Sequence, residues 1–179
     1  MRRAPLALAL LAAAPFAAAQ ASNVQIGANV NAYFFADGKL RNAFGNPALT
    51  YGANLTALNR PSANKLTFAY DIITADRGDS RLFVLPFTVG YEKQFADAKT
   101  ANVLPYFRVE GGVSYYDVAL HDGGNDIAYK SYGGVGGAEV GLVFSKTLAV
   151  KAKYYIFQGR EGVNFSGFQV GLTYNFGRL

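Results

Sequence analysis

The chain has no cysteine and no tryptophan, and only one histidine and one methionine among its 179 residues. The absence of cysteine excludes a disulfide scaffold and a thiolate-ligated metal site. Charged residues make up 16%, well below the roughly 25% of soluble domains. The apolar share of 51% is too high for intrinsic disorder. The length suits one domain, and the low charge disfavours an ordinary soluble enzyme.

Long apolar runs are also scarce. The one extended run, residues 4–16, follows two arginines, contains two prolines and leads into small residues that end at Ala21. This order predicts a secretory signal peptide over residues 1–21. A membrane anchor is the weaker alternative, because it needs about 20 uninterrupted apolar residues. The mature chain would carry 15 basic and 12 acidic residues, a net charge of +3 that gives no reason to expect nucleic acid.

Beyond residue 21 no apolar run approaches the 18 residues of a membrane helix, which excludes a helical membrane protein. Apolar and polar residues instead alternate with a period of two, which is typical of strands with one apolar face. The segment at 81–91 is apolar on both faces, so its phase is the least defined. The predicted strands cover residues 24–34, 49–57, 66–72, 81–91, 105–116, 132–144, 148–157 and 165–176.

The length of these segments favours a membrane barrel over a soluble sandwich. Sandwich strands average about 5 to 6 residues, whereas about 9 to 11 residues cross a bilayer at a tilt. The sequence therefore predicts an all-β fold for residues 22–179, an eight-stranded antiparallel up-and-down transmembrane β-barrel. An even strand count places both termini on one side. The predicted connections are residues 36–48, 59–65, 75–80, 92–102, 117–131, 145–147 and 158–163.

Six charged residues lie within the predicted strands, all on the face opposite the apolar side chains. They are Asp71, Arg108, Glu110, Glu139, Lys151 and Lys153. An Arg or Lys facing lipid costs about 2 to 4 kcal/mol at the midplane, so a membrane barrel must direct these charges to its lumen. Eight strands enclose only enough space for side chains. We therefore expect a lumen plugged by a salt-bridged network; the alternative is a soluble sandwich with solvated charges.

The tight turn predicted at residues 145–147 sets the register of its hairpin. It places Phe144 opposite Leu148, and therefore Glu139 opposite Lys153. A slip by one residue would oppose an inward carboxylate to an outward aromatic residue, which the pleat forbids. The turn therefore predicts a cross-strand ion pair in the lumen.

Aromatic residues gather near the ends of the predicted strands, as in the interfacial girdles of outer-membrane barrels. The general preference of Tyr and Phe for strands explains part of this pattern, and the absence of tryptophan is unusual for a girdle. One predicted rim contains Phe34, Phe35, Tyr115, Tyr116, Tyr132, Phe157 and Phe165. The other contains Tyr91, Phe144, Tyr174 and Phe176.

The last predicted strand, Phe168-Gln-Val-Gly-Leu-Thr-Tyr-Asn-Phe176, alternates hydrophobic residues and ends in an aromatic one. In this respect, and in its hairpin between Gly137 and Tyr155, the chain resembles the small outer-membrane β-barrels of the OmpA, OmpX and OmpW kind. The resemblance implies a location in the outer membrane of a two-membrane bacterium, in contact with its lipid. It also implies insertion by the β-barrel assembly machinery, guided by a C-terminal signal of Phe168, Val170, Leu172, Tyr174 and Phe176.

Catalytic and metal-binding chemistry find little support. The single histidine, His121, falls in the predicted Gly-rich loop at 117–131, which offers no rigid frame for a nucleophile and base. Asp117, Asp122 and Asp126 carry oxygen atoms that suit calcium, but they lack the EF-hand spacing. We therefore expect no catalytic site, no metal and no cofactor.

Three hypotheses follow for the function. The first is a structural or surface-interaction barrel whose loops at 36–48 and 117–131 meet an extracellular or envelope partner. The second is a narrow channel for small or apolar solutes, with the lumenal charges as a gate. The third is a lipid-modifying barrel enzyme centred on His121.

Overall fold

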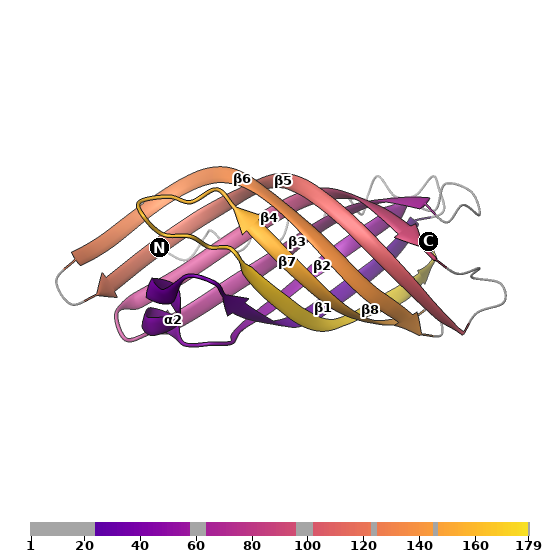
Figure 1. The fold of residues 1–179 in the computed structure, drawn as a ribbon, viewed down its shortest axis with the longest axis horizontal. Helices are drawn as coiled ribbons and strands as arrows, with labels where there is room; N and C mark the ends of the chain where they lie inside the picture. The colour runs from indigo at the N-terminus through magenta and orange to yellow at the C-terminus, as the bar shows by residue number, and fades with distance from the viewer. Residues whose placement is uncertain (1–23, 58–63, 96–101, 123–124, 145–146, 179) are drawn as a thin grey trace.

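The computed structural model describes residues 24–57, 64–95, 102–122, 125–144 and 147–178; the predicted signal peptide lies outside them. Within these ranges eight strands form one closed barrel in which each strand pairs with its neighbour along the chain and β8 pairs antiparallel with β1 (Figure 1). This confirms the predicted architecture. The strands are β1 (Val24–Phe35), β2 (Ala48–Ala57), β3 (Asn64–Arg77), β4 (Ser80–Gln94), β5 (Val103–Asp122), β6 (Asn125–Phe144), β7 (Leu148–Phe157) and β8 (Gly167–Arg178).

The outer face of the barrel is apolar. Along β7, for example, Val150, Tyr154 and Ile156 are 40, 44 and 62% exposed, while Lys151 and Lys153 between them are buried. The other strands repeat this arrangement, with outward residues such as Val30, Phe68, Val89 and Leu172. A soluble barrel would direct its apolar residues inward, so this inversion requires a hydrocarbon environment outside.

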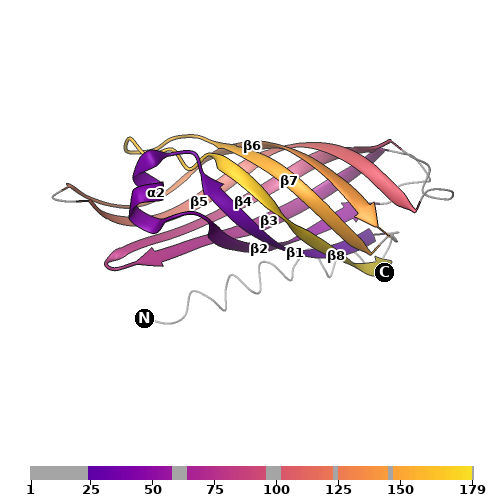
Figure 2. The ribbon, with the colours of Figure 1, turned by 60° about the horizontal axis from the view of Figure 1, so that its bottom comes forward.

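The β5–β6 hairpin extends well beyond the rest of the wall (Figure 2). Both strands are 20 residues long, and they pair as far as Asp122 and Asn125. The predicted loop at 117–131 was therefore wrong, because most of it is paired strand. Val118 and Leu120 continue the inward phase of β5, and Ile127 and Tyr129 pack against the same apolar cluster. The glycines and aspartates in the sequence at 117–126 are typical of loops, and for this reason the sequence predicted a loop where the strands continue.

A second predicted loop, residues 36–48, contains the helix α2 (Gly38–Phe44). Asp37 caps it, its side chain accepting a hydrogen bond of 2.7 Å from the backbone N–H of Lys39. Gly45, with φ of 79°, ends the helix in a conformation that disfavours residues with a Cβ. Leu40 is fully buried in the barrel mouth. In the described ranges no helix has the length and apolarity needed to cross a membrane.

The interior divides into two regions along the barrel axis. Toward the end that carries α2 it is apolar, and several aromatic residues assigned to a rim from sequence lie inside this region. That assignment was wrong for Phe35, Tyr116, Phe157 and Phe165, which are at most 4% exposed. The rest of the interior, toward the C-terminal end of β8, is polar and charged. Figure 2 shows α2 at one end of the barrel and the C-terminus at the other.

Candidate functional site

The structure places the six predicted charged residues inside the barrel, on four strands. Asp71 comes from β3, Arg108 and Glu110 from β5, Glu139 from β6, and the two lysines from β7. All six are at most 8% exposed. They lie there because each shares the phase of the inward polar residues on its strand.

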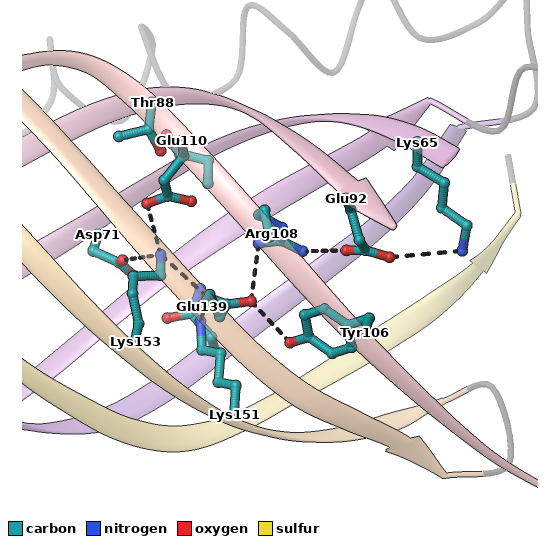
Figure 3. Close-up of polar contacts among 12 residues, drawn as sticks. Lys65, Asp71, Thr88, Glu92, Tyr106, Arg108, Glu110, Glu139, Lys151 and Lys153 are labelled. Carbon is teal, nitrogen blue, oxygen red and sulfur yellow. Dashed lines mark hydrogen bonds and ion pairs between the residues drawn. The ribbon is translucent and has the colours of Figure 1, made fainter. Parts of the chain in front are cut away.

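Lys153 is the centre of this network. Its Nζ lies 3.4 Å from Asp71 Oδ2, 3.0 Å from Glu110 Oε1 and 3.3 Å from Glu139 Oε2 (Figure 3). The ladder between β6 and β7 places Glu139 directly opposite Lys153, which confirms the predicted register. The hydroxyl of Tyr155 donates to Asp71 Oδ2 at 2.6 Å. One buried ammonium group thus contacts three carboxylates that come from three different strands.

Glu139 is the second centre. Arg108 Nη1 lies 3.2 Å from its Oε1, and Lys151 Nζ lies 3.7 Å from its Oε2. The hydroxyl of Tyr106 donates to Oε1 at 2.8 Å. The carboxylate is therefore held by charges from β5 and β7 and by a neutral donor from β5. Such paired and hydrogen-bonded geometry is the condition under which buried charges are tolerated.

The network also includes residues that sequence reasoning missed. Arg108 Nη2 lies 2.7 Å from Glu92 Oε2, and Lys65 Nζ lies 3.9 Å from Glu92 Oε1. The predicted strand ended at Tyr91, whereas β4 continues to Gln94 and directs Glu92 inward. The alternation of Thr88, Gly90 and Glu92 was the available signal. With these additions four carboxylates meet four cations, so the network formed by the described residues is formally neutral.

Small residues make room for the large side chains of the lumen. Gly141 lies directly across from Tyr106 in the β5–β6 ladder. A Cβ at position 141 would stand 2.5 Å from the Tyr106 ring, closer than carbon atoms approach. The phenol therefore crosses the face of this glycine to reach Glu139, and the glycine is part of the network's geometry.

The end of the barrel interior that carries α2 is filled by apolar side chains, which we call the mouth cluster. It consists of the aliphatic residues there and of the aromatic residues Tyr33, Phe35, Tyr116, Tyr155, Phe157 and Phe165. The Tyr116 ring packs 4.9 Å from Phe165 and 6.1 Å from Phe157. Phe165 belongs to the segment between β7 and β8, which folds back into the opening and buries Val163 as well. The mouth is therefore filled by side chains.

Two contacts fasten the filling segments to each other. Asp37 Oδ2 accepts a hydrogen bond of 2.9 Å from the backbone N–H of Asn164. Lys39 Nζ donates to the carbonyl of Gly162 at 3.4 Å. The helix α2 and the segment at 158–166 thus meet across the mouth as one unit.

His121 lies on β5 rather than in a loop, and it points outward. Its side chain is 48% exposed, with Nε2 at 3.9 Å from Asp126 Oδ2. Ser80 Oγ accepts a hydrogen bond of 3.0 Å from the backbone N–H of His121, and Ser80 is itself buried on the inward face of β4. Imidazole and hydroxyl therefore lie on opposite faces of the sheet, which does not suit a Ser–His device.

The aspartates considered for calcium do not gather. Asp117 forms an ion pair with Lys130 at 3.0 Å, and Asp126 is exposed beside His121. The side chain of Asp122 lies outside the described part of the structure. In the described residues no group of three or more acidic, histidine or cysteine side chains is placed to hold a metal ion.

The predicted C-terminal signal forms the lipid-facing side of β8. Its five residues point outward and are between 38 and 54% exposed: Phe168, Val170, Leu172, Tyr174 and Phe176. The inward residues between them are polar except for Gly171, and Gln169 donates a hydrogen bond of 2.7 Å over β1 to Thr50 Oγ1 on β2. As the partner of both β7 and β1, β8 is the strand that closes the barrel.

A family model described as "outer membrane protein beta-barrel domain" matches residues 4–176. The chain belongs to this family. Solved structures of other barrels show the same fold, although their sequences are distant. The Neisserial surface protein A (NspA) is 14% identical with a TM-score of 0.56, and the alignment covers 86% of this chain and 96% of that chain.

Two further barrels agree. The N-terminal β-barrel domain of Pseudomonas aeruginosa OprF is 16% identical, with a TM-score of 0.52 and coverage of 87% and 98% of the two chains. Ail, the attachment invasion locus protein of Yersinia pestis, is 13% identical, with a TM-score of 0.53 and coverage of 86% and 97%. The curated proteins contain no match to this chain. Membership of this family locates the protein in the outer membrane, where the apolar outer face of its barrel contacts lipid.

Proposed function

We propose that this outer-membrane barrel is a non-conducting structural and surface-interaction protein. The observation that carries this proposal is the filled interior. The central side chains Asp71, Glu139 and Lys153 are at most 1% exposed, so water does not reach them through either end. A water-filled pore of the porin type would leave its lumenal charges accessible.

The filling has two different layers, which strengthens the proposal. Ions would have to displace the network around Lys153 and would then meet the mouth cluster, where Tyr116, Phe157 and Phe165 offer no charge. An apolar constriction opposes ions because they would lose their hydration there. Each layer by itself would resist conduction.

Single-channel recording in planar bilayers tests the proposal. The purified mature chain should insert without a steady current, whereas an open trimeric or monomeric porin in the same bilayers supplies the positive control. A steady open current of the wild-type chain would contradict the filled lumen.

A narrow gated channel is the second candidate, because the network is asymmetric: among the described residues, Lys153 is the one cation within ion-pair distance of Asp71 and of Glu110. Replacing Lys153 by Met would then raise the conductance by opening the gate. If the variant folds and stays silent, the gate hypothesis fails and the plug is supported. Folding of the variant is checked by its heat-modifiable migration in SDS gels.

A lipid-modifying activity is disfavoured by the separation of His121 and Ser80 on opposite faces of the sheet. We infer that the chain is not an enzyme. A His121→Ala variant expressed in place of the wild type should leave the lipid composition of the outer membrane unchanged. A shift in acyl-chain composition that depends on His121 would overturn this inference.

We further propose that the outward row on β8 serves as the signal for the assembly machinery, since it is continuous, apolar and on the closing strand. Phe176→Ala should slow insertion into the outer membrane. Phe87→Ala, which removes another exposed phenylalanine of the outer face, should not.

We propose that the extracellular contact surface consists of α2 and the projecting β5–β6 hairpin, because outer-membrane barrels carry their longer loops on the extracellular side.

A further inference from the structure

The projecting hairpin leaves one edge of the sheet open. The ladder between β6 and β7 stops at the pair Val135 and Phe157, whereas the ladder between β5 and β6 continues to Asp122 and Asn125. Among the described residues, the stretch of β6 at 126–130 therefore pairs with β5 on one side and with no strand on the other. Such an edge is a template for another strand.

The direction of the backbone groups on this edge follows from the contacts just below it. The carbonyl of Gly134 accepts from the backbone N–H of Gln158 at 2.9 Å, and the carbonyl of Tyr132 accepts from Arg160 Nη2 at 2.9 Å. Because alternate residues of a strand direct their backbone groups to the same side, Lys130, Ala128 and Asp126 present their N–H and C=O groups to the open edge.

The sequence of the open edge is complementary to itself. It reads Asp126-Ile127-Ala128-Tyr129-Lys130. If a second copy runs antiparallel with Ala128 opposite Ala128, each aspartate faces a lysine and each isoleucine faces a tyrosine. Both charged side chains reach solvent, since Asp126 and Lys130 are 70 and 67% exposed, and Lys130 would share its charge between Asp117 of its own chain and the aspartate of the second copy. Opposite charges and aliphatic–aromatic pairs both stabilise antiparallel neighbours.

We propose that this edge binds a second copy of the same chain, through antiparallel pairing of residues 126–130 centred on Ala128. In this register Asp126 lies opposite Lys130 and Ala128 opposite Ala128, so the residues that direct their backbone groups to the open edge face one another. Each of these three pairs exchanges two hydrogen bonds, which gives about six in total. A parallel arrangement would instead bring like charges side by side. The proposal goes beyond the structural role proposed above and does not depend on the filled lumen.

Antiparallel pairing determines how the two barrels are oriented. The two strands run in opposite directions, so the two barrels also point in opposite directions. In cells the paired copies would therefore belong to two facing outer membranes, whereas in detergent micelles both orientations are free. Pairing is then a homotypic contact between cells.

Cross-linking tests the central residue. The chain has no cysteine, so Ala128→Cys introduces a unique thiol at the point where two copies meet. Ala119→Cys is the matched control, because Ala119 is the direct partner of Ala128 on β5 but does not lie on the open edge. Under mild oxidation in detergent, we expect a disulfide-linked dimer for Ala128→Cys and at least tenfold less for Ala119→Cys. Equal cross-linking of the two variants would overturn the proposal.

A charge exchange tests the pairing itself. Asp126→Lys and Lys130→Asp each create two like-charge pairs in the dimer and should weaken self-association by about tenfold in sedimentation velocity. The double variant, and an equimolar mixture of the two single variants, should restore it. Failure of both restorations would refute the register. If the Ala128→Cys variant on whole cells forms cross-links only to a different protein, the open edge binds a strand of that protein. This result would also overturn self-pairing.

Discussion

The barrel interior has two regions that both exclude bulk water but differ in chemistry. The lower region is the charged network toward the C-terminal end of β8, and the upper region is the mouth cluster at the end that carries α2. The lower region neutralises charge: Lys153 and Glu139 each contact at least three ionic or hydroxyl partners. The mouth cluster excludes charge, and aromatic rings from β1, β5 and β7 pack there with segments that fold in from outside the sheet. The lower region depends on directed contacts and the upper region on packed volume.

This difference predicts how each region fails. Removing one partner of a buried ion cluster leaves an uncompensated charge, which costs more than the pair itself contributes. Removing a ring from the mouth cluster leaves a cavity, whose cost depends on how far the neighbours collapse. The following substitutions test the comparison, from the largest expected effect to the smallest.

Lys153→Met should destabilise the barrel most, by about 3–5 kcal/mol, because Asp71, Glu110 and Glu139 lose their shared cation in a buried site. Urea unfolding in detergent measures the change. Lys93→Met, which replaces an exposed lysine on the outer face of β4, should change the stability by less than about 0.5 kcal/mol. Similar losses for both variants would show that burial of the network contributes little.

Phe165→Ala should cost about 3 kcal/mol, since its ring fills the mouth between Tyr116 and the barrel wall. Phe168→Ala, only three residues away, removes a ring from the lipid-facing side and should cost less, because lipid fills the space. The same unfolding assay compares them. An equal cost would indicate that the interior packing of the mouth is loose.

Gly141→Ala should cost about 1–3 kcal/mol, because the added methyl group meets the Tyr106 ring and displaces the hydroxyl from Glu139. Gly136→Ala on the same strand is the control. A Cβ there would have only the carbonyl of Glu110 nearby, at 3.6 Å, which is an ordinary contact. If the control is as destabilising as Gly141→Ala, the effect belongs to the strand and not to the network.

Asp37→Ala should have the smallest effect, about 1 kcal/mol, through loss of the helix cap and of the bond to Asn164. Because both contacts lie in the mouth, the change should be local. Hydrogen exchange should accelerate in α2 and in the segment at 158–166, while the strands around Lys153 keep their protection. Uniform acceleration would mean that the two regions unfold as one unit.

Much of the lower region could be predicted from the sequence. The period of two assigns each strand residue to a face, and a charge cannot face hydrocarbon, so Arg108, Glu110 and Lys151 had to point inward. The tight turn predicted at residues 145–147 also gave the register of Glu139 against Lys153, which the β6–β7 ladder has. Glu92 was missed because the predicted strand ended at Tyr91, three residues before the end of β4 at Gln94.

The upper region could not be predicted in this way. The inward phase of Tyr116 and Phe157 was readable, but their position near the strand ends assigned these rings to an interfacial girdle at the rim. Leu40 and Phe165 lie outside the regular strands, on α2 and on the segment before β8, where the period of two carries no information. Their burial depends on how these segments fold back into the mouth.

The amino-acid sequence by itself determined the eight strands, the face that each side chain takes and the inward position of the charged residues, because side-chain direction along a strand is a local property of the pleat. The tertiary structure alone decided which carboxylate meets which cation across the lumen, how the mouth is filled and which edge of β6 stays open. These features join residues far apart in the chain, as Asp71 and Lys153 are, and their distances arise only when the barrel closes.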